Sequence, residues 1–75
     1  MRNMVYVIDV AVKEERRDFL IARMDAFGLT AVRDEYNPAR MDYDMKFEVS
    51  NGTKDKVIGF LDEEGFKRWA SPKIS

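Results

Sequence analysis

The side chains that could do chemistry in this chain are mainly carboxylates, because its 75 residues include neither histidine nor cysteine. Without histidine the chain lacks the commonest metal ligand and the commonest general base near neutral pH. Without cysteine it lacks thiolate chemistry and disulfides. An enzyme needs a positioned acid, base or nucleophile in a concave site. We therefore expect no catalytic residue, no metal site and no cofactor, and we interpret the protein as non-enzymatic.

Two acidic groups come nearest to a metal site or a catalytic carboxylate pair. Asp42 and Asp44 share one face of a predicted strand, and residues 62–64 read Asp-Glu-Glu. The EF-hand spacing is absent, and no sequence neighbour suggests a raised carboxyl pKa. We expect both groups to be solvated acidic surface, which can also recognise a basic partner.

Residues 50–54 (SNGTK) lie between a predicted strand and a predicted helix, where free backbone N–H groups can hold an anion. The phosphate-loop spacing G-x-x-x-x-G-K is absent. We therefore interpret this stretch as a capping turn, with Asn51 or Thr53 as the N-cap residue.

Composition limits the partners that the chain can have. Thirteen basic and 14 acidic residues give a formal net charge of −1, whereas nucleic-acid binders usually carry a basic patch, so nucleic acid is an unlikely ligand. No apolar run approaches the roughly 20 residues of a membrane span. The absence of cysteine and of an export signal favours the cytoplasm. The length predicts one domain, residues 1–75, whose small core needs good packing or oligomerisation.

Hydrophobic periodicity predicts the elements that carry these side chains. Apolar and polar residues alternate from Tyr43 to Ser50, which is typical of a strand with one dry face. The apolar stripe of residues 13–27 predicts a helix that ends at Gly28, a left-handed stop. The complete prediction is strand Met4–Val12, helix Lys13–Phe27, edge strand Leu29–Tyr36, turn Asn37–Arg40, strand Asp42–Ser50 and helix Thr53–Leu61.

The C-terminal segment is open to two interpretations. Asp62 suits an N-cap, and Lys67 and Arg68 suit a helix C-terminus. We therefore predict a short helix over Glu63–Ala70, with a tail at residues 73–75 and a short fourth strand as the alternative. Trp69 would then plug the core or, as the alternative, serve as an exposed anchor.

The order β-α-β-β-α with a short C-terminal helix predicts an α+β fold, the ferredoxin-like split β-α-β arrangement. Its antiparallel sheet would have three strands in the order 1-3-2, possibly four, with the helices on one face. Without a fourth strand, the first strand is a hydrophobic edge that carries Val5 and Val7 on the open face. We expect a second chain to cover this edge, with the C-terminal segment as the alternative.

Residues 5–10 (VYVIDV) resemble the first-strand motif of RNA-recognition domains. The resemblance implies that Tyr6, Tyr43 and Phe47 stack on bases. The third strand departs from the family, because it lacks the glycines and the leading basic residue. If these aromatics faced RNA, the helices would have to pack on Asp44 and Lys46, which costs too much desolvation energy. We therefore predict that the three aromatics belong to the core.

The resulting prediction is a small non-enzymatic module that binds a larger protein by occlusion or edge-strand pairing. Two copies of the module could first form a homodimer that then binds this partner. Compact, mildly acidic chains of this kind include phage or mobile-element inhibitors of host or defence proteins, such as anti-CRISPR-type inhibitors. An RNA-recognition-like domain and an ACT-like ligand-sensing dimer are the alternatives. The expected partner-binding residues are Val5, Val7, Asp9, Arg33, Glu35, Arg40, Asp42, Asp44 and Trp69.

Overall fold

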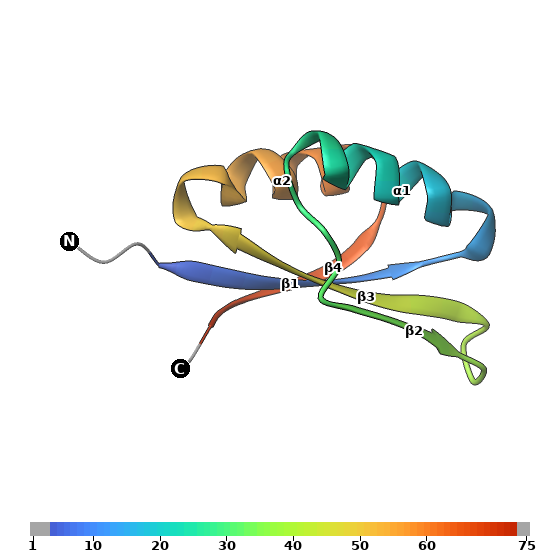
Figure 1. The fold of residues 1–75 in the computed structure, drawn as a ribbon. Coiled ribbons are helices and arrows are strands. Elements are labelled where there is room, and N and C mark those ends of the chain that lie inside the picture. The colour runs from blue at the N-terminus through green and yellow to red at the C-terminus, as the bar shows by residue number, and fades with distance from the viewer. Residues whose placement is uncertain (1–3, 74–75) are drawn as a thin grey trace.

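The computed structural model describes residues 4–73 as two helices packed on a four-stranded sheet. Both helices lie on one face of the sheet, and no helix or strand of the described residues covers the other face (Figure 1). In chain order the elements are β1 (Val5–Val12), α1 (Glu14–Ala26), β2 (Arg33–Asn37), β3 (Asp42–Ser50), α2 (Asn51–Glu63) and β4 (Lys67–Pro72).

The sheet has the strand order β2-β3-β1-β4, and every neighbouring pair is antiparallel. The predicted order 1-3-2 of the first three strands is confirmed, as is the edge position of β2. The α+β class with both helices on one face is consistent with a ferredoxin-like arrangement. The observed order is β-α-β-β-α-β, so each half of the chain forms one β-α-β unit. The predicted order β-α-β-β-α lacked the last strand.

The predicted C-terminal helix over Glu63–Ala70 is wrong. Helix α2 continues through residue 63, and Gly65 then reverses the chain with a φ of 75°. Residues 67–72 pair with β1, with Lys67 opposite Ala11 and Pro72 opposite Tyr6. Arg68 also binds Asp62 through two hydrogen bonds of 3.0 and 2.9 Å. This contact lowers the pKa of the Asp62 carboxyl and ties β4 to the end of α2.

The open edge expected at the first strand does not exist. Strand β1 lies inside the sheet, with β3 on one side and β4 on the other. The C-terminal segment therefore covers this edge, which was the alternative prediction, and β2 and β4 are the edges of the sheet. Edge-strand pairing through β1 is excluded, because its backbone groups are already paired.

The core lies between the helices and one face of the sheet. Alternate residues of β1 and β3 point into it, as the period of two predicts. Tyr6, Tyr43 and Phe47 all lie on this helix-facing side, so their predicted place in the core is confirmed. The buried hydrophobic residues are Ile8, Val10, Val12, Leu20, Met24, Met45, Phe47, Val49, Val57, Phe60, Leu61 and Phe66.

The starts of β2 and α2 and the N-cap of α2 also differ from prediction. Strand β2 begins at Arg33 rather than Leu29, because residues 29–32 form the connection from α1. Helix α2 begins two residues early, with Ser50 rather than Asn51 or Thr53 at the N-cap position. The Ser50 side chain makes no capping hydrogen bond, but its hydroxyl bonds the Thr53 hydroxyl at 3.3 Å. Of the predicted tail at residues 73–75, positions 74 and 75 lie outside the described residues.

Candidate functional site

One row of side chains crosses all four strands on the face of the sheet that no described helix covers. Strand pairing places Arg33 of β2 opposite Lys46 of β3, Lys46 opposite Asp9 of β1, and Asp9 opposite Trp69 of β4. These four residues come from distant parts of the sequence. The antiparallel register brings them together because directly opposed residues in neighbouring strands project from the same face.

A second row runs beside the first one. It contains Glu35, Asp44, Ala11 and Lys67, again one residue from each strand. The two rows together carry three acidic and three basic side chains, and on β2 and β3 each basic residue of the first row stands beside an acidic residue of the second. We define the open-face site as the six residues that line a shallow depression of about 330 Å³ on this face: Asp9, Arg33, Glu35, Asp44, Lys46 and Trp69.

Arg33 and Glu35 form an ion pair at the β2 side of this site. The Nη2 of Arg33 donates to Oε2 of Glu35 at 2.9 Å, and both side chains remain more than half exposed. This hydrogen bond raises the pKa of Arg33. Because an exposed ion pair contributes little to stability, about 0–1 kcal/mol, breaking this pair would cost the fold little.

Trp69 is the largest apolar group at the site, and 58% of its surface is exposed. The prediction of a core plug is therefore wrong. Trp69 is exposed, as the alternative required, and its role as an anchor for a partner stays a prediction. Tryptophan is enriched among the residues that dominate binding energy at protein interfaces, because one rigid side chain supplies a large contact area. A solvent-exposed tryptophan beside balanced charges is the most distinctive feature of this face.

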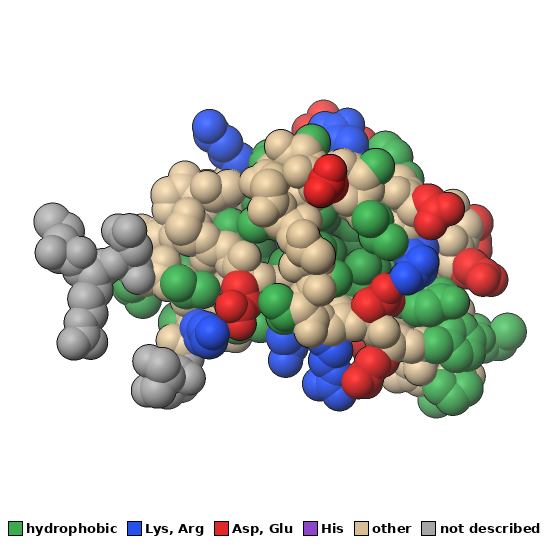
Figure 2. All heavy atoms as spheres, viewed as in Figure 1, with side chains coloured by type: hydrophobic (Ala, Val, Ile, Leu, Met, Phe, Trp, Pro, Cys, Tyr) green, Lys and Arg blue, Asp and Glu red, His purple; other side chains and the backbone are tan. Residues whose placement is uncertain are grey.

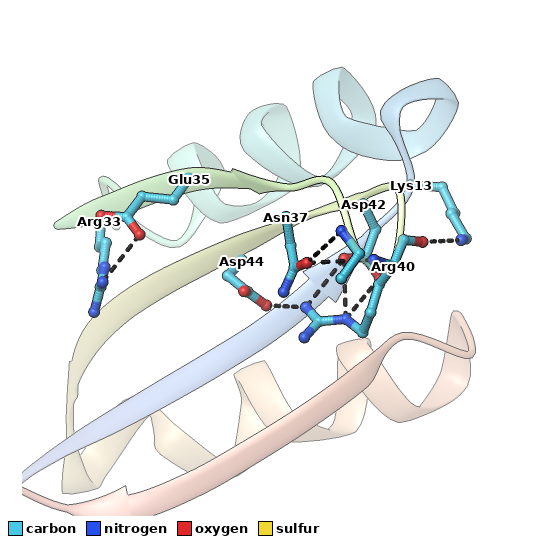
Figure 3. A network of polar contacts seen from close by, with 8 residues as sticks. Lys13, Arg33, Glu35, Asn37, Arg40, Asp42 and Asp44 are labelled. Atoms are coloured by element: carbon cyan, nitrogen blue, oxygen red, sulfur yellow. Dashed lines mark hydrogen bonds and ion pairs between the residues drawn. The ribbon is translucent and has the colours of Figure 1, made fainter.

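A second polar cluster lies where β2 turns into β3. The guanidinium of Arg40 reaches both Asp42 and Asp44, as Figure 3 shows. Only 8% of Asp42 is exposed, and its ion pair with Arg40 measures 3.0 Å. The hydrogen bonds from Arg40 to the two carboxylates raise the pKa of the guanidinium. One guanidinium therefore partly neutralises the negative charge of both aspartates.

The side chain of Asn37 organises the same turn. Its Oδ1 accepts hydrogen bonds from the backbone N–H groups of Ala39 and Arg40 at 3.0 and 3.2 Å. Asparagine favours this local arrangement because its short side chain can mimic a backbone turn. The turn therefore holds Arg40 on the open-face side, beside Asp44, and Asp44 links this cluster to the open-face site.

Five of the nine predicted partner-binding residues line the open-face site: Asp9, Arg33, Glu35, Asp44 and Trp69. Val5 and Val7 lie farther along β1 on the same face, whereas Arg40 and Asp42 belong to the turn cluster. Sequence reasoning left Lys46 and Lys67 out of the set. Lys46 could have been found from the alternation in β3, which places it on the same face as Asp44.

The open face differs from the base-stacking surface of RNA-recognition domains. Tyr6, Tyr43 and Phe47 pack against the core instead of projecting from this face. Three carboxylates also stand among the cations, and phosphate backbones require a surplus of positive charge. Within residues 4–73, no group of three or more acidic, histidine or cysteine side chains is arranged to hold a metal ion.

Neither of the two described helices has the length and apolar character needed to cross a membrane. Comparison of the chain with protein-family models, with curated proteins and with solved structures finds no significant match.

Proposed function

We propose that this protein is a non-enzymatic binding module that recognises another protein through the open face of its sheet. The observation that carries the proposal is Trp69, an exposed tryptophan at the end of a charged row that spans all four strands. A large aromatic anchor surrounded by polar groups of both signs is typical of protein interfaces, in which a few residues supply most of the binding energy.

The size of the face fits this proposal. The molecule measures 41 × 24 × 18 Å along its principal axes, so its broad side covers roughly 1,000 Å². A standard protein interface uses about 800 Å² per partner. The whole open face could therefore be occupied by one partner without any rearrangement of the fold.

The balance of charge favours a protein partner over a nucleic acid. Arg33, Lys46 and Lys67 can pair with acidic groups, and Asp9, Glu35 and Asp44 can pair with basic ones. Such a pattern selects a partner with the complementary arrangement and repels others. The module would act by occlusion, covering a functional surface of a larger protein. This is how a phage or mobile-element inhibitor of a host or defence protein would work.

The test uses Trp69→Ala with Met41→Ala as the matched control. Met41 is 69% exposed at the β2–β3 turn and lies outside the open-face site. Each protein, in addition to the wild type, is immobilised and exposed to a lysate of the cells that encode it, and captured proteins are quantified by mass spectrometry. A specific partner should be retained by the wild type and by Met41→Ala and lost with Trp69→Ala.

Once such a partner is purified, Trp69→Ala should weaken its binding by about 2 kcal/mol or more, roughly a thirtyfold higher Kd. Equal affinity of the wild type and Trp69→Ala would show that the open face is not the interface. A labelled single-stranded RNA serves as the competing ligand. Salt-sensitive RNA binding that is lost with Trp69→Ala would replace the proposal with nucleic-acid recognition.

A further inference from the structure

A groove of about 470 Å³ lies on the helix side of the sheet, between α1 and the start of β2. Leu29, Ala31, Met45 and Phe47 form its apolar lining, and Ile21 stands at its edge with 37% of its surface exposed. Figure 2 shows hydrophobic side chains at the bottom of a hollow between the helix layer and the sheet. The groove exists because the connection after α1 pairs with β3 only from Val32 onward, through the hydrogen bond to the Lys46 carbonyl.

The polar residues at this groove are acidic or uncharged. Asp18 and Asp25 come from α1 and Asp34 from β2, and neither lysine nor arginine lines the groove. Arg17 pairs with Asp34 and lies 4.0 Å from Asp18, so one of the three charges is compensated. Within residues 4–73 no ion pair reaches Asp25. The rim therefore keeps a net negative charge above an apolar floor.

We propose that this groove is a second protein-binding site, which accepts a partner segment with one aliphatic or aromatic side chain flanked by lysine or arginine. The apolar side chain would cover Leu29 and Ala31, while the flanking cations would pair with Asp18 and Asp25. The volume lies within the roughly 300–1,000 Å³ of pockets that bury a ligand. Charge complementarity selects a basic segment, because an acidic one would meet uncompensated carboxylates.

This site is separate from the open face. In β3, Met45 and Phe47 point into the groove, whereas Asp44 and Lys46 point to the opposite side of the sheet. A segment in the groove would not contact Trp69. The protein could therefore hold two partners, or two parts of one partner, on opposite layers, which goes beyond the function proposed above.

The test titrates the full ¹⁵N-labelled chain with the capped peptide Lys-Lys-Phe-Lys-Lys and follows the amide signals by NMR. Shifts should concentrate at Ala22, Leu29 and Ala31 and saturate with a Kd of ~1 mM or lower. The peptides Lys-Lys-Ala-Lys-Lys and Glu-Glu-Phe-Glu-Glu are the controls for the apolar anchor and for the charge. Each should bind at least about tenfold more weakly.

Variants locate the effect in the protein. Asp25→Lys should weaken binding of the Lys-Lys-Phe-Lys-Lys peptide by about tenfold. Asp55→Lys makes the same change of charge on the far helix, where the Asp55 side chain is 92% exposed, and should leave the affinity nearly unchanged. Equal weakening by both variants, no saturable shifts, or shifts confined to the open face would each overturn the proposal. If the amide signals of the groove residues shift when the protein is concentrated without peptide, the occupant of the groove would instead be a second copy of the chain.

Discussion

Phe66 and Trp69 show how one choice of secondary structure decides the role of a side chain. Residues three apart share a face of a helix, but they point to opposite faces of a strand. Phe66 is 8% exposed, packs on Phe60 and lies 4.2 Å beneath the guanidinium of Arg16. Trp69 faces away from the helices, opposite Asp9. Only one of these two aromatics can therefore support the core.

Truncation of the two aromatics should have very different costs. We expect Phe66→Ala to lower the free energy of unfolding by about 3 kcal/mol, because it leaves a cavity among Phe19, Phe60 and Arg16. We expect Trp69→Ala to change it by less than about 1 kcal/mol, because the removed surface is largely exposed. Urea unfolding followed by circular dichroism measures both. Similar costs for the two variants would place Trp69 in the core.

The two helices end by the same mechanism. After α1, Gly28 donates to the Asp25 carbonyl at 2.8 Å, and Leu29 donates to the Met24 carbonyl at 2.9 Å. After α2, Gly65 and Phe66 make the equivalent hydrogen bonds to residues 62 and 61. Both glycines have positive φ, so each forms a Schellman motif. Gly28 was recognised from the sequence, and Gly65 carried the same signal for the end of α2.

Two glycine substitutions test this account of the second helix. Gly65→Ala should destabilise the protein by about 1–2 kcal/mol, because alanine resists the left-handed conformation that the stop requires. Gly59→Ala is the control within the same helix, at an exposed site where, apart from the adjoining helix backbone, an added methyl has no neighbour within 4 Å. It should stabilise the protein by up to about 1 kcal/mol. Thermal unfolding of both variants checks these opposite signs, and stabilisation by Gly65→Ala would contradict the proposed stop.

At the scale of the whole molecule, β4 decides which surfaces remain for partners. It covers β1, so the hydrophobic strand in the middle of the sheet presents a side-chain face and no free backbone edge. The available edges are the short β2, which carries three charged residues in a row at its start, and β4, which ends at Pro72. Charged side chains and proline both deter pairing between edges. The binding surfaces to test are therefore the open face of the sheet and the groove beside α1, rather than the edges of the sheet.

Light scattering across a dilution series tests whether β1 has any role in assembly, with the wild type beside Val7→Lys. Val7 lies on the open face opposite Glu48 and Ser71, so a lysine there can reach solvent without breaking strand pairing. We expect both proteins to have the mass of one chain at every concentration. A wild-type dimer that Val7→Lys separates into folded monomers would show that the β1 face is an assembly surface.

The sequence alone determined which side chains share a face along each strand. The alternation in residues 43–50 predicted the bounds of β3, and the same period placed Tyr6, Tyr43 and Phe47 on the core side. This works because the pleat of a strand sends neighbouring residues to opposite faces whatever else the chain does. The apolar stripe of residues 13–27, followed by Gly28, similarly predicted α1 to within one residue at each end.

Only the tertiary structure decided the secondary structure of residues 67–72 and which residues make up the open-face site. Their local preferences suit a helix or a strand, and pairing with β1 selects the strand because it satisfies backbone groups that both segments would otherwise leave unpaired. Asp9, Arg33, Lys46 and Trp69 lie far apart in the chain, and no local pattern relates them. Their common row depends on the register of three strand pairs, which long-range packing sets.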